Sequence, residues 1–453
     1  MVLVGLSSFL VTIYFEGFNS SYTRWVITVY VFAFCFILGI RFLDRAVKLI
    51  NDKVSTFPTA IVYGAGELGS TMARMSTKGV YEYNIIGFID DKEYLKGSLV
   101  VNKPVLGSID DIDKILKDNN PKTFIVAITN ISSEKVHKAV TSAKKYGIEV
   151  KIVPNLFETR GRGDVSLRDI NYEDLLGRSL TILDRKPMEE LFKDKTVLVT
   201  GAGGSIGSEI CNQLMTYNIA KLIALDIDET ELHDLCLRLL KYDGEWSEEV
   251  VPVVCDIRNE KKVSLIMDTY KPDIVIHAAA YKHVPLMEKF PEEAVITNIC
   301  GSYNVFKSAR NSKVSRVIVI STDKAVNPTN VMGATKRVVE MMSRTFNCPE
   351  TQFCCVRFGN VIGSRGSMLP LFLEQIKAGK PITVPPKDIT RYFMAIPEAV
   401  SLVFRAATLA QGGEVMVLDM GSPVRIYDFA QKLIDVFGDG RSSIKVTGLR
   451  PGE

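Results

Sequence analysis

The stretch TVLVTGAGGSIG, residues 196–207, places an apolar strand directly before a glycine-rich loop. A short apolar run bounded by turn residues is typical of a parallel strand that is covered on both faces. The glycines are spaced as Gly201-x-x-Gly204-x-x-Gly207, and the last of them opens a helix. Glycines at this spacing let the backbone turn tightly and approach a pyrophosphate at the helix N-terminus. The stretch therefore predicts the first strand, loop and helix of a Rossmann-like domain.

Three further strands follow the loop in the order expected of a dinucleotide-binding domain. Residues 222–225 form the next strand, which ends in Asp226. A carboxylate at this point accepts hydrogen bonds from the adenosine ribose hydroxyls and repels a 2′-phosphate, so we expect NAD rather than NADP. Residues 251–255 and 274–276 form the next two strands, and polar or small residues follow each of them. The predicted cofactor-binding residues are Gly201, Gly204, Ser205, Ile206, Gly207, Asp226, Asp256, Ile257, Ala278, Ala279 and Ala280.

A second informative stretch, STDKAVNPTNVMGATK at residues 321–336, follows the apolar strand 317–320. Ligands of open α/β sheets bind at the carboxyl ends of the strands, where Thr322, Asp323 and Lys324 stand in a row. Adjacent strand residues point to opposite faces, so these three share one site only if the chain leaves the strand here. The Asn-Pro pair that follows indicates that it does.

The first 50 residues predict a transmembrane segment. Residues 1–15 and 25–40 are two apolar runs without a charged side chain, and basic residues follow the second run. A signal peptide or a buried core helix is the alternative, but the first run has no basic leader and no small-residue cleavage site. We expect a multi-pass protein of the inner (cytoplasmic) membrane that contacts lipid through residues 1–50, with its catalytic domains in the cytoplasm.

Residues 54–155 predict a small Rossmann-like α/β domain. The strand 59–63 leads into GAGELG at residues 64–69, and strands and helices then alternate as far as residue 153. Whether this loop holds a nucleotide stays open, since a retained fold that serves as a spacer or regulator explains the same residues. We interpret residues 156–190 as a connector and residues 191–453 as the second, catalytic α/β domain. The expected fold class is two Rossmann-like parallel-sheet domains behind a transmembrane segment.

Composition excludes several classes of function. The chain has 453 residues, enough for two or three domains, and a net charge of +3, which gives no reason to expect nucleic acid. Its eight cysteines form no CxxC pairs, and its four histidines form no helical ligand pair. We therefore expect no metal site and no disulfides, and reduced thiols in a cytoplasmic domain.

Four motifs together resemble those of a known family. The chain is similar to membrane-bound polysaccharide-biosynthesis proteins of the extended short-chain dehydrogenase/reductase superfamily, above all to UDP-N-acetylglucosamine 4,6-dehydratases. Family members carry more membrane spans than the two expected here and continue beyond the final LRPGE, so the sequence is expected to be truncated at both ends. The motifs are TGAGGSIG at residues 200–207, AAAYKHVP at 278–285, the stretch 321–336 and RFGNV at 357–361.

The resemblance implies a dehydration that consumes no cofactor: NAD takes a hydride from sugar C4, water leaves across C5 and C6, and the hydride returns to C6. The superfamily carries a tyrosine four residues before Lys336, but this chain has Met332, whose thioether cannot take a proton. In relatives with this methionine the neighbouring triplet acts. We accordingly assign Thr322 to the C4 hydroxyl, Asp323 as general acid, Lys324 as general base and Lys336 to the nicotinamide ribose.

The substrate implied by the resemblance is a UDP-N-acetylhexosamine, bound by a protein that forms a homo-oligomer. Asn360 is a polar anchor, and Arg365 and Arg391 can pair with diphosphate oxygens. Lys282 and His283 follow the fourth strand of the second domain and should border the sugar. Asn360, Arg365 and Arg391 could instead be surface residues, and His283 could instead be a packed histidine.

Two other functions remain open. A UDP-sugar 4-epimerase would use the same cofactor but leave the C6 hydroxyl in place. Alternatively, Met332 could mark an inactive NAD-binding scaffold that docks glycan enzymes at the membrane. The intact triplet argues against the scaffold, and the product distinguishes the two enzymes.

Overall fold

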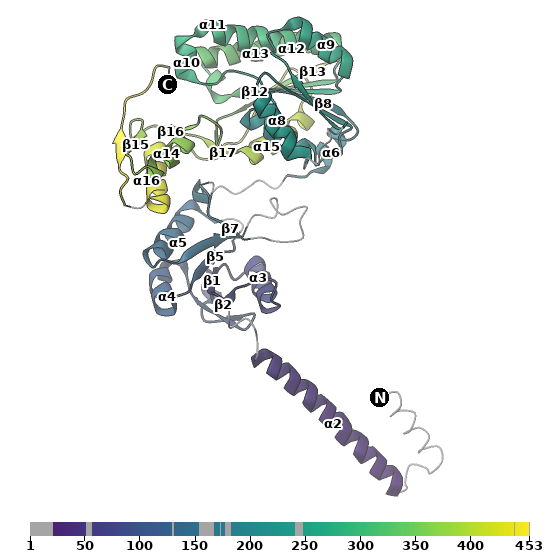
Figure 1. Ribbon diagram of the computed structural model, residues 1–453, viewed down its shortest axis with the longest axis vertical. Coiled ribbons are helices and arrows are strands. Elements are labelled where there is room, and N and C mark those ends of the chain that lie inside the picture. Colours follow the sequence, from purple (N-terminus) through teal and green to yellow (C-terminus); the bar gives the residue numbers. More distant parts are fainter. Residues whose placement is uncertain are drawn as a thin grey trace. The chain divides into compact units, whose positions relative to one another are not determined.

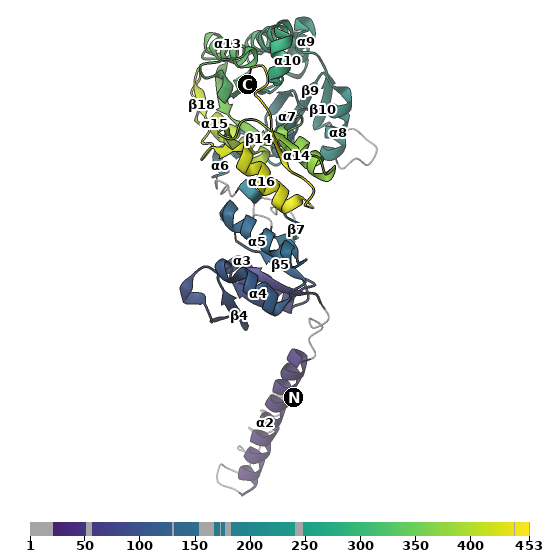
Figure 2. The same cartoon turned by 90° about the vertical axis from the view of Figure 1, so that its left-hand side faces the viewer.

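A computed structural model describes most of the chain in two compact units. The first unit comprises Met1–Ile128 and Ser142–Asp169, and the second comprises Thr129–Thr141 and Ile170–Glu453. Each contains one seven-stranded sheet (Figures 1 and 2). The described residues are 21–50, 57–128, 131–153, 167–172, 174–176, 183–240, 248–438 and 440–452.

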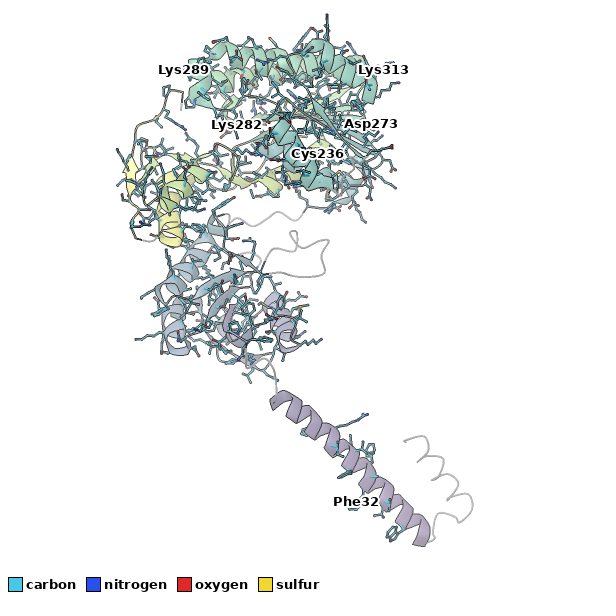
Figure 3. All side chains as sticks on the ribbon, in the orientation of Figure 1. Phe32, Cys236, Asp273, Lys282, Lys289 and Lys313 are labelled. Atoms are coloured by element: carbon cyan, nitrogen blue, oxygen red, sulfur yellow. The ribbon has the colours of Figure 1, made fainter. Side chains whose placement is uncertain are left out.

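Helix α2, Ser21–Ile50, contains the second apolar run of the sequence. Roughly 16 apolar residues extend only about 24 Å as a helix, less than the ~30 Å hydrocarbon core of a bilayer. The same helix then continues into the charged residues Arg41, Asp44 and Arg45, while apolar side chains such as Phe32 stand exposed on it (Figure 3).

The predicted membrane location is wrong. Within the described part of the chain, no helix combines the length and the apolar character needed to cross a membrane. The expected multi-pass arrangement in the inner membrane and the expected lipid contacts are therefore not supported. The first apolar run, residues 1–15, lies outside the described residues.

The sheet of the first unit has the strand order β3-β4-β2-β1-β5-β6-β7. β1 pairs in parallel with both β2 and β5, while β3 and β7 pair antiparallel with their neighbours. The parallel core confirms the predicted alternation of strands and helices. The elements are β1 Thr59–Tyr63, α3 Glu67–Thr77, β2 Asn84–Ile89, β3 Leu99–Val100, β4 Lys103–Gly107, α4 Ile112–Asn119, β5 Thr123–Val126, β6 Glu149–Ile152 and β7 Arg168–Asp169. Helix α5, Ser133–Lys145, precedes β6, and its residues as far as Thr141 are assigned to the second unit.

The sheet of the second unit is parallel throughout, in the order β10-β9-β8-β11-β12-β13-β18. The chain order reverses between β8 and β11, and ligands of doubly wound sheets bind at such a point, beyond the carboxyl ends of the strands. The predicted Rossmann-like fold is confirmed. The strands are β8 Thr196–Thr200, β9 Lys221–Asp226, β10 Val250–Val254, β11 Ile274–His277, β12 Arg316–Thr322, β13 Gln352–Phe358 and β18 Val415–Val417.

Two apolar layers cover this sheet because successive strand residues point to opposite faces. In β8, Val197 and Val199 pack into one core cluster and Leu198 into the other. Residues of α6, α7, α8 and α15 complete the first cluster, and residues of α9, α12 and α13 complete the second (Figure 1). These helices are α6 Lys186–Phe192, α7 Ser205–Leu214, α8 Glu229–Leu240, α9 Glu260–Tyr270, α12 Ser302–Asn311, α13 Val331–Phe346 and α15 Ile396–Leu409.

Shorter elements carry the chain beyond the sheet. The helices α10 Val284–Lys289 and α11 Pro291–Ala294 follow β11, and a π-helical turn, Val295–Gly301, leads into α12. The C-terminal region adds small paired strands and two helices. They are β14 Asn360–Ile362, α14 Met368–Lys377, β15 Ile382–Val384, β16 Thr390–Arg391, β17 Phe393–Ala395, β19 Val424–Arg425, α16 Ile426–Phe437 and β20 Ile444–Val446.

Candidate functional site

The glycine loop between β8 and α7 has the geometry of a phosphate cradle. Gly201 has φ +70°, and a Cβ there would lie 2.7 Å from the backbone nitrogen of Ala279. The glycine at position 201 thus lets the loop lie directly against the backbone that follows β11. α7 begins at Ser205 with Gly204 as its N-cap, and no side chain caps the helix. Because its first N–H groups have no partner within the helix, this terminus can hold an anion.

Asp226, the last residue of β9 and the predicted ribose ligand, is hydrogen-bonded to this loop. Its Oδ2 accepts a hydrogen bond from the Gly203 N–H at 2.8 Å, and its Oδ1 accepts one from the Asp228 N–H at 3.0 Å. The carboxylate therefore stands at the edge of the loop, where a ribose would lie.

The two residues predicted after β10 have different environments. Arg258 donates to Asp256 at 2.8 Å, and this hydrogen bond holds the pKa of the Asp256 carboxyl below its usual range. Ile257 is buried and belongs to the core cluster formed with α9 and α12. Ile257 is therefore a core residue in this structure, and Asp256 is the more exposed of the two.

A buried histidine that the sequence reading did not select lies beneath the glycine loop. His277 ends β11 and shares hydrogen bonds with the Thr200 hydroxyl at Nδ1 (2.7 Å) and with the Ser302 hydroxyl at Nε2 (2.8 Å). Burial lowers its pKa to about 3, with a smaller contribution from the charge of Lys336. His277 is thus a neutral link between β8, β11 and α12. The sequence feature that could have identified it is a histidine at the end of an apolar strand.

The triplet after β12 forms a connected polar cluster. β12 extends two residues beyond the predicted strand 317–320 and ends at Thr322, where a 3-10 turn, Asp323–Ala325, begins at once, so the chain leaves the strand within the triplet. The Thr322 hydroxyl donates to Asp323 Oδ1 at 2.9 Å. Lys324 Nζ donates to Asp323 Oδ1 at 3.0 Å and to Asn360 Oδ1 at 3.2 Å. The structure therefore joins Asn360, a predicted substrate residue, to the proposed catalytic residues.

Lys336 lies in the second turn of α13, a helix capped by the Asn330 side chain. Its side chain is directed under β12, where Nζ donates to the Ile320 carbonyl at 2.9 Å. Only 8% of the residue is exposed, and burial lowers its pKa to about 8.

Met332 shares a helix with Lys336 but has a different environment. It is 4% exposed and packs in a small apolar cluster with residues of α10 and α11. Its thioether therefore fills space between helices. The cluster contains Val284, Met287, Ala294 and Met332, with Val331 packed against it.

Glu340 is a second residue that the sequence reading missed. It is 1% exposed, and Arg357 binds it with two hydrogen bonds, from Nε at 2.7 Å and from Nη2 at 2.6 Å. The Ser321 hydroxyl donates to the same carboxylate at 2.6 Å. This cluster ties α13 to the ends of β12 and β13, which carry the triplet and lead to Asn360. The signal was an arginine in the RFGNV motif and an acid one helical turn after Lys336.

The remaining predicted substrate residues form two groups. Lys282, beyond the carboxyl end of β11 (Figure 3), donates from Nζ to the Arg365 carbonyl at 2.8 Å, and the His283 ring lies beside Gly366. Burial lowers the pKa of both Lys282 and His283. Arg391 instead lies in β16, where it donates to the Thr390 carbonyl at 2.9 Å. Among the described residues no hydrogen bond joins it to the triplet.

Comparisons with known proteins identify the family to which the chain belongs. A family profile described as "Polysaccharide biosynthesis protein" matches residues 197–453, and one described as "PglD N-terminal domain" matches residues 59–137. Capsular polysaccharide biosynthesis protein CapD of Staphylococcus aureus is 43% identical over 420 residues, which cover 91% of this chain and 69% of the relative. Probable polysaccharide biosynthesis protein EpsC of Bacillus subtilis (strain 168) is 39% identical over 452 residues, covering 97% and 75%.

Among solved structures, Pen from Bacillus thuringiensis is 36% identical with a TM-score of 0.54, and the match covers 58% of this chain and 82% of that one. It supports the fold of the second unit, whereas the two polysaccharide-biosynthesis relatives match nearly the whole chain. The chain therefore belongs to the polysaccharide-biosynthesis family of extended short-chain dehydrogenases/reductases that its motifs resemble.

Proposed function

We propose that the protein is a nucleotide-sugar 4,6-dehydratase whose NAD stays bound and is regenerated within each cycle. Its substrate is UDP-N-acetylglucosamine and its product UDP-2-acetamido-2,6-dideoxy-4-hexulose, a precursor for bacterial polysaccharide or glycoprotein glycans. The observation that carries the proposal is the hydrogen-bonded cluster of Thr322, Asp323, Lys324 and Asn360 at the carboxyl end of β12. The names of the CapD and EpsC relatives support the biosynthetic context.

The second unit has residues that fit NAD. The uncapped N-terminus of α7 and the close approach of Gly201 to Ala279 suit a pyrophosphate, and Asp226 suits the adenosine ribose. Lys336, buried beneath β12, is the group for the nicotinamide ribose. NAD supplies the hydride acceptor and donor for the sugar carbons, and this chain's residues hold it in place and move the protons.

Proton transfer falls to Asp323 and Lys324. To take the C5 proton Lys324 must be neutral, and to give a proton to the departing C6 hydroxyl Asp323 must carry one. The two groups form an ion pair at 3.0 Å. Lys324 becomes neutral by releasing its proton to solvent as the sugar binds, and Asp323 then gains the proton of the C4 hydroxyl through Thr322, so that each proton has one source and one destination. A bound sugar that excludes water favours this neutral pair, because removal of solvent disfavours charge.

Thr322 and Asn360 place these groups. The Thr322 hydroxyl already contacts Asp323, so a proton from the C4 hydroxyl has a short path to the carboxylate. Asn360 holds the Lys324 ammonium from the opposite side. Catalytic groups that are held in place in this way contribute much of an enzyme's rate enhancement, because their orientation toward the substrate is fixed before the reaction.

Incubation of the purified protein with UDP-N-acetylglucosamine tests the proposal, with the product identified by NMR. A dehydratase yields a 4-keto sugar whose C6 has become a methyl group. A 4-epimerase yields a sugar of unchanged mass with its C6 hydroxyl retained, and an inactive scaffold yields no product. Either of the last two results would refute the proposed function.

A further inference from the structure

A short loop lies across the glycine loop of the second unit. Residues 363–367, which we call the clasp, follow β14 and precede α14. The backbone N–H of Arg365 donates to the Ser205 hydroxyl at 3.0 Å, and the Arg365 guanidinium forms an ion pair with Glu231. Lys282 Nζ donates to the Arg365 carbonyl. Gly366, at φ +66°, has no side chain to collide with the His283 ring.

The partners of the clasp flank the expected cofactor position. Ser205 is the first residue of α7, directly after the glycine loop. Glu231 lies in the first turn of α8, which follows Asp226 at the end of β9. A dinucleotide at this edge has its pyrophosphate at the start of α7 and its ribose at Asp226. The clasp therefore joins the two elements between which the adenosine half lies.

We propose that Arg365 and Glu231 are cofactor-retaining residues, and that the clasp slows the dissociation of NAD. The inference rests on the proposed function in that NAD occupies the glycine loop. It revises the expectation that Arg365 binds the sugar diphosphate, since the structure commits this guanidinium to Glu231 and its backbone to Ser205.

Retention suits the proposed chemistry. The hydride taken from C4 must return to C6 of the same sugar. If the reduced cofactor dissociated during the cycle, it would carry the hydride away and leave the sugar intermediate unreduced at C6. The clasp begins directly after β14, whose first residue, Asn360, contacts Lys324. One continuous segment thus contacts Lys324 through Asn360 and the start of α7 through Arg365.

The size of the effect follows from exposure. The Arg365 side chain is 52% exposed and that of Glu231 28%, so water screens their ion pair and its contribution is modest. We expect loss of the pair to accelerate NAD release roughly two- to tenfold, and not to abolish binding.

The test measures NAD release from the full-length protein, chased with excess isotope-labelled NAD. Four variants are compared with the wild type: Arg365→Ala, Glu231→Ala, the charge exchange Glu231→Arg with Arg365→Glu, and Lys307→Ala. The last removes a comparably exposed ion pair with Glu260, between α9 and α12. Release should accelerate in both alanine variants, return toward the wild-type rate in the charge exchange, and stay at that rate in Lys307→Ala.

The charge exchange separates the clasp from sugar binding. A guanidinium that pairs with diphosphate oxygens cannot be replaced by a carboxylate, whatever stands at position 231. The clasp is refuted if the exchanged protein releases NAD as fast as the alanine variants. It is also refuted if both alanine variants release NAD at the wild-type rate while Arg365→Ala raises the KM for UDP-N-acetylglucosamine. A wild-type protein that neither contains nor takes up NAD refutes the proposed function, and the clasp with it.

Discussion

Met332 and Lys324 have different roles because their side chains and their surroundings differ. The sequence indicated that a thioether takes no part in proton transfer, but it gave no role for the methionine. The structure supplies one, since Met332 fills an apolar cluster against α10 and α11. Lys324 instead contacts Asp323 and Asn360 in the polar cluster after β12. The two residues therefore differ in chemistry and in surroundings.

Lys324→Ala should abolish dehydration if Lys324 is the C5 base. Removal of a general base typically costs 10²–10⁴-fold in rate. The same change should stop solvent deuterium from entering C5, which NMR of the sugar nucleotide detects. Lys261→Ala, at an exposed position of α9, serves as the control and should keep the wild-type rate. Exchange at C5 that persists in Lys324→Ala would show that another group removes this proton.

Met332→Leu should be nearly harmless. Its side chain is 4% exposed among apolar neighbours, and volume-conserving swaps in such places usually cost under ~1.5 kcal/mol. The measurement is kcat alongside the thermal midpoint. Thr322→Val is the informative companion, since it keeps the volume but removes the hydroxyl that donates to Asp323. If Met332→Leu lost as much activity as Lys324→Ala while folded with NAD bound, the assignment of roles would be wrong.

His277 should make the stability of the second unit depend on pH. Its pKa falls to about 3 in the folded protein from 6.5, so between these values the unfolded chain binds more protons than the folded one. The free energy of unfolding therefore decreases as the pH falls from 6.5 toward 3, and this contribution is fully present above pH 6.5. Urea unfolding from pH 4 to 7 should show a shallower dependence in His277→Asn. An equal slope in both proteins would contradict the buried neutral histidine.

At the scale of single elements, α13 combines three roles on one helix. Met332 packs outward against α10, Lys336 extends under β12, and Glu340 binds Arg357 and Ser321. The helix thereby fixes the triplet, the lysine and the end of β13 relative to one another.

Glu340→Gln should destabilise the protein by about 3–5 kcal/mol, because it leaves the Arg357 guanidinium without its anionic partner. Replacing both residues by methionine should cost less than the single change, since an apolar pair needs no compensation for lost solvent. Urea unfolding of the three proteins tests this expectation. A double variant less stable than Glu340→Gln would mean that the pair contributes more than it costs to bury.

Elements built from local patterns were predictable, and contacts between distant segments were not. The apolar run and the Asn-Pro pair predicted the end of β12 to within two residues, and the glycine spacing predicted the loop before α7. The link between Glu340 and Arg357 joins α13 to β13, the next strand along the chain. The clasp joins Arg365 to Glu231 across several elements. A motif or a helical spacing can mark one residue of such a pair, but only the folded arrangement reveals which residue is its partner.

At the scale of the molecule, the apolar N-terminal segment was misjudged. The composition of residues 25–40 predicted a membrane span, yet the described helix continues into charged residues and does not meet the requirements for crossing a membrane. The hydropathy of a sequence window measures only its composition. Whether the segment can cross a membrane also depends on where the helix begins and ends and on which residues it includes.

The protein should not need its N-terminal segment for chemistry. Residues 25–40 contain no charged or histidine side chain, so they offer no acid or base to the sugar. A chain that starts at residue 54 should convert UDP-N-acetylglucosamine at a rate close to that of the full chain in detergent-free buffer. Complete loss of activity in a folded shortened chain would contradict this independence.

The central claim is that one hydride leaves C4 and returns to C6 of the same sugar. Its most direct test is turnover of UDP-N-acetylglucosamine deuterated at C4, without added nicotinamide, followed by NMR and mass spectrometry of the product. The account predicts a 4-keto product that has lost one water and carries the deuterium in its C6 methyl group, with no accumulation of NADH. A product that keeps its C6 hydroxyl, or one whose label is lost to solvent, would contradict it.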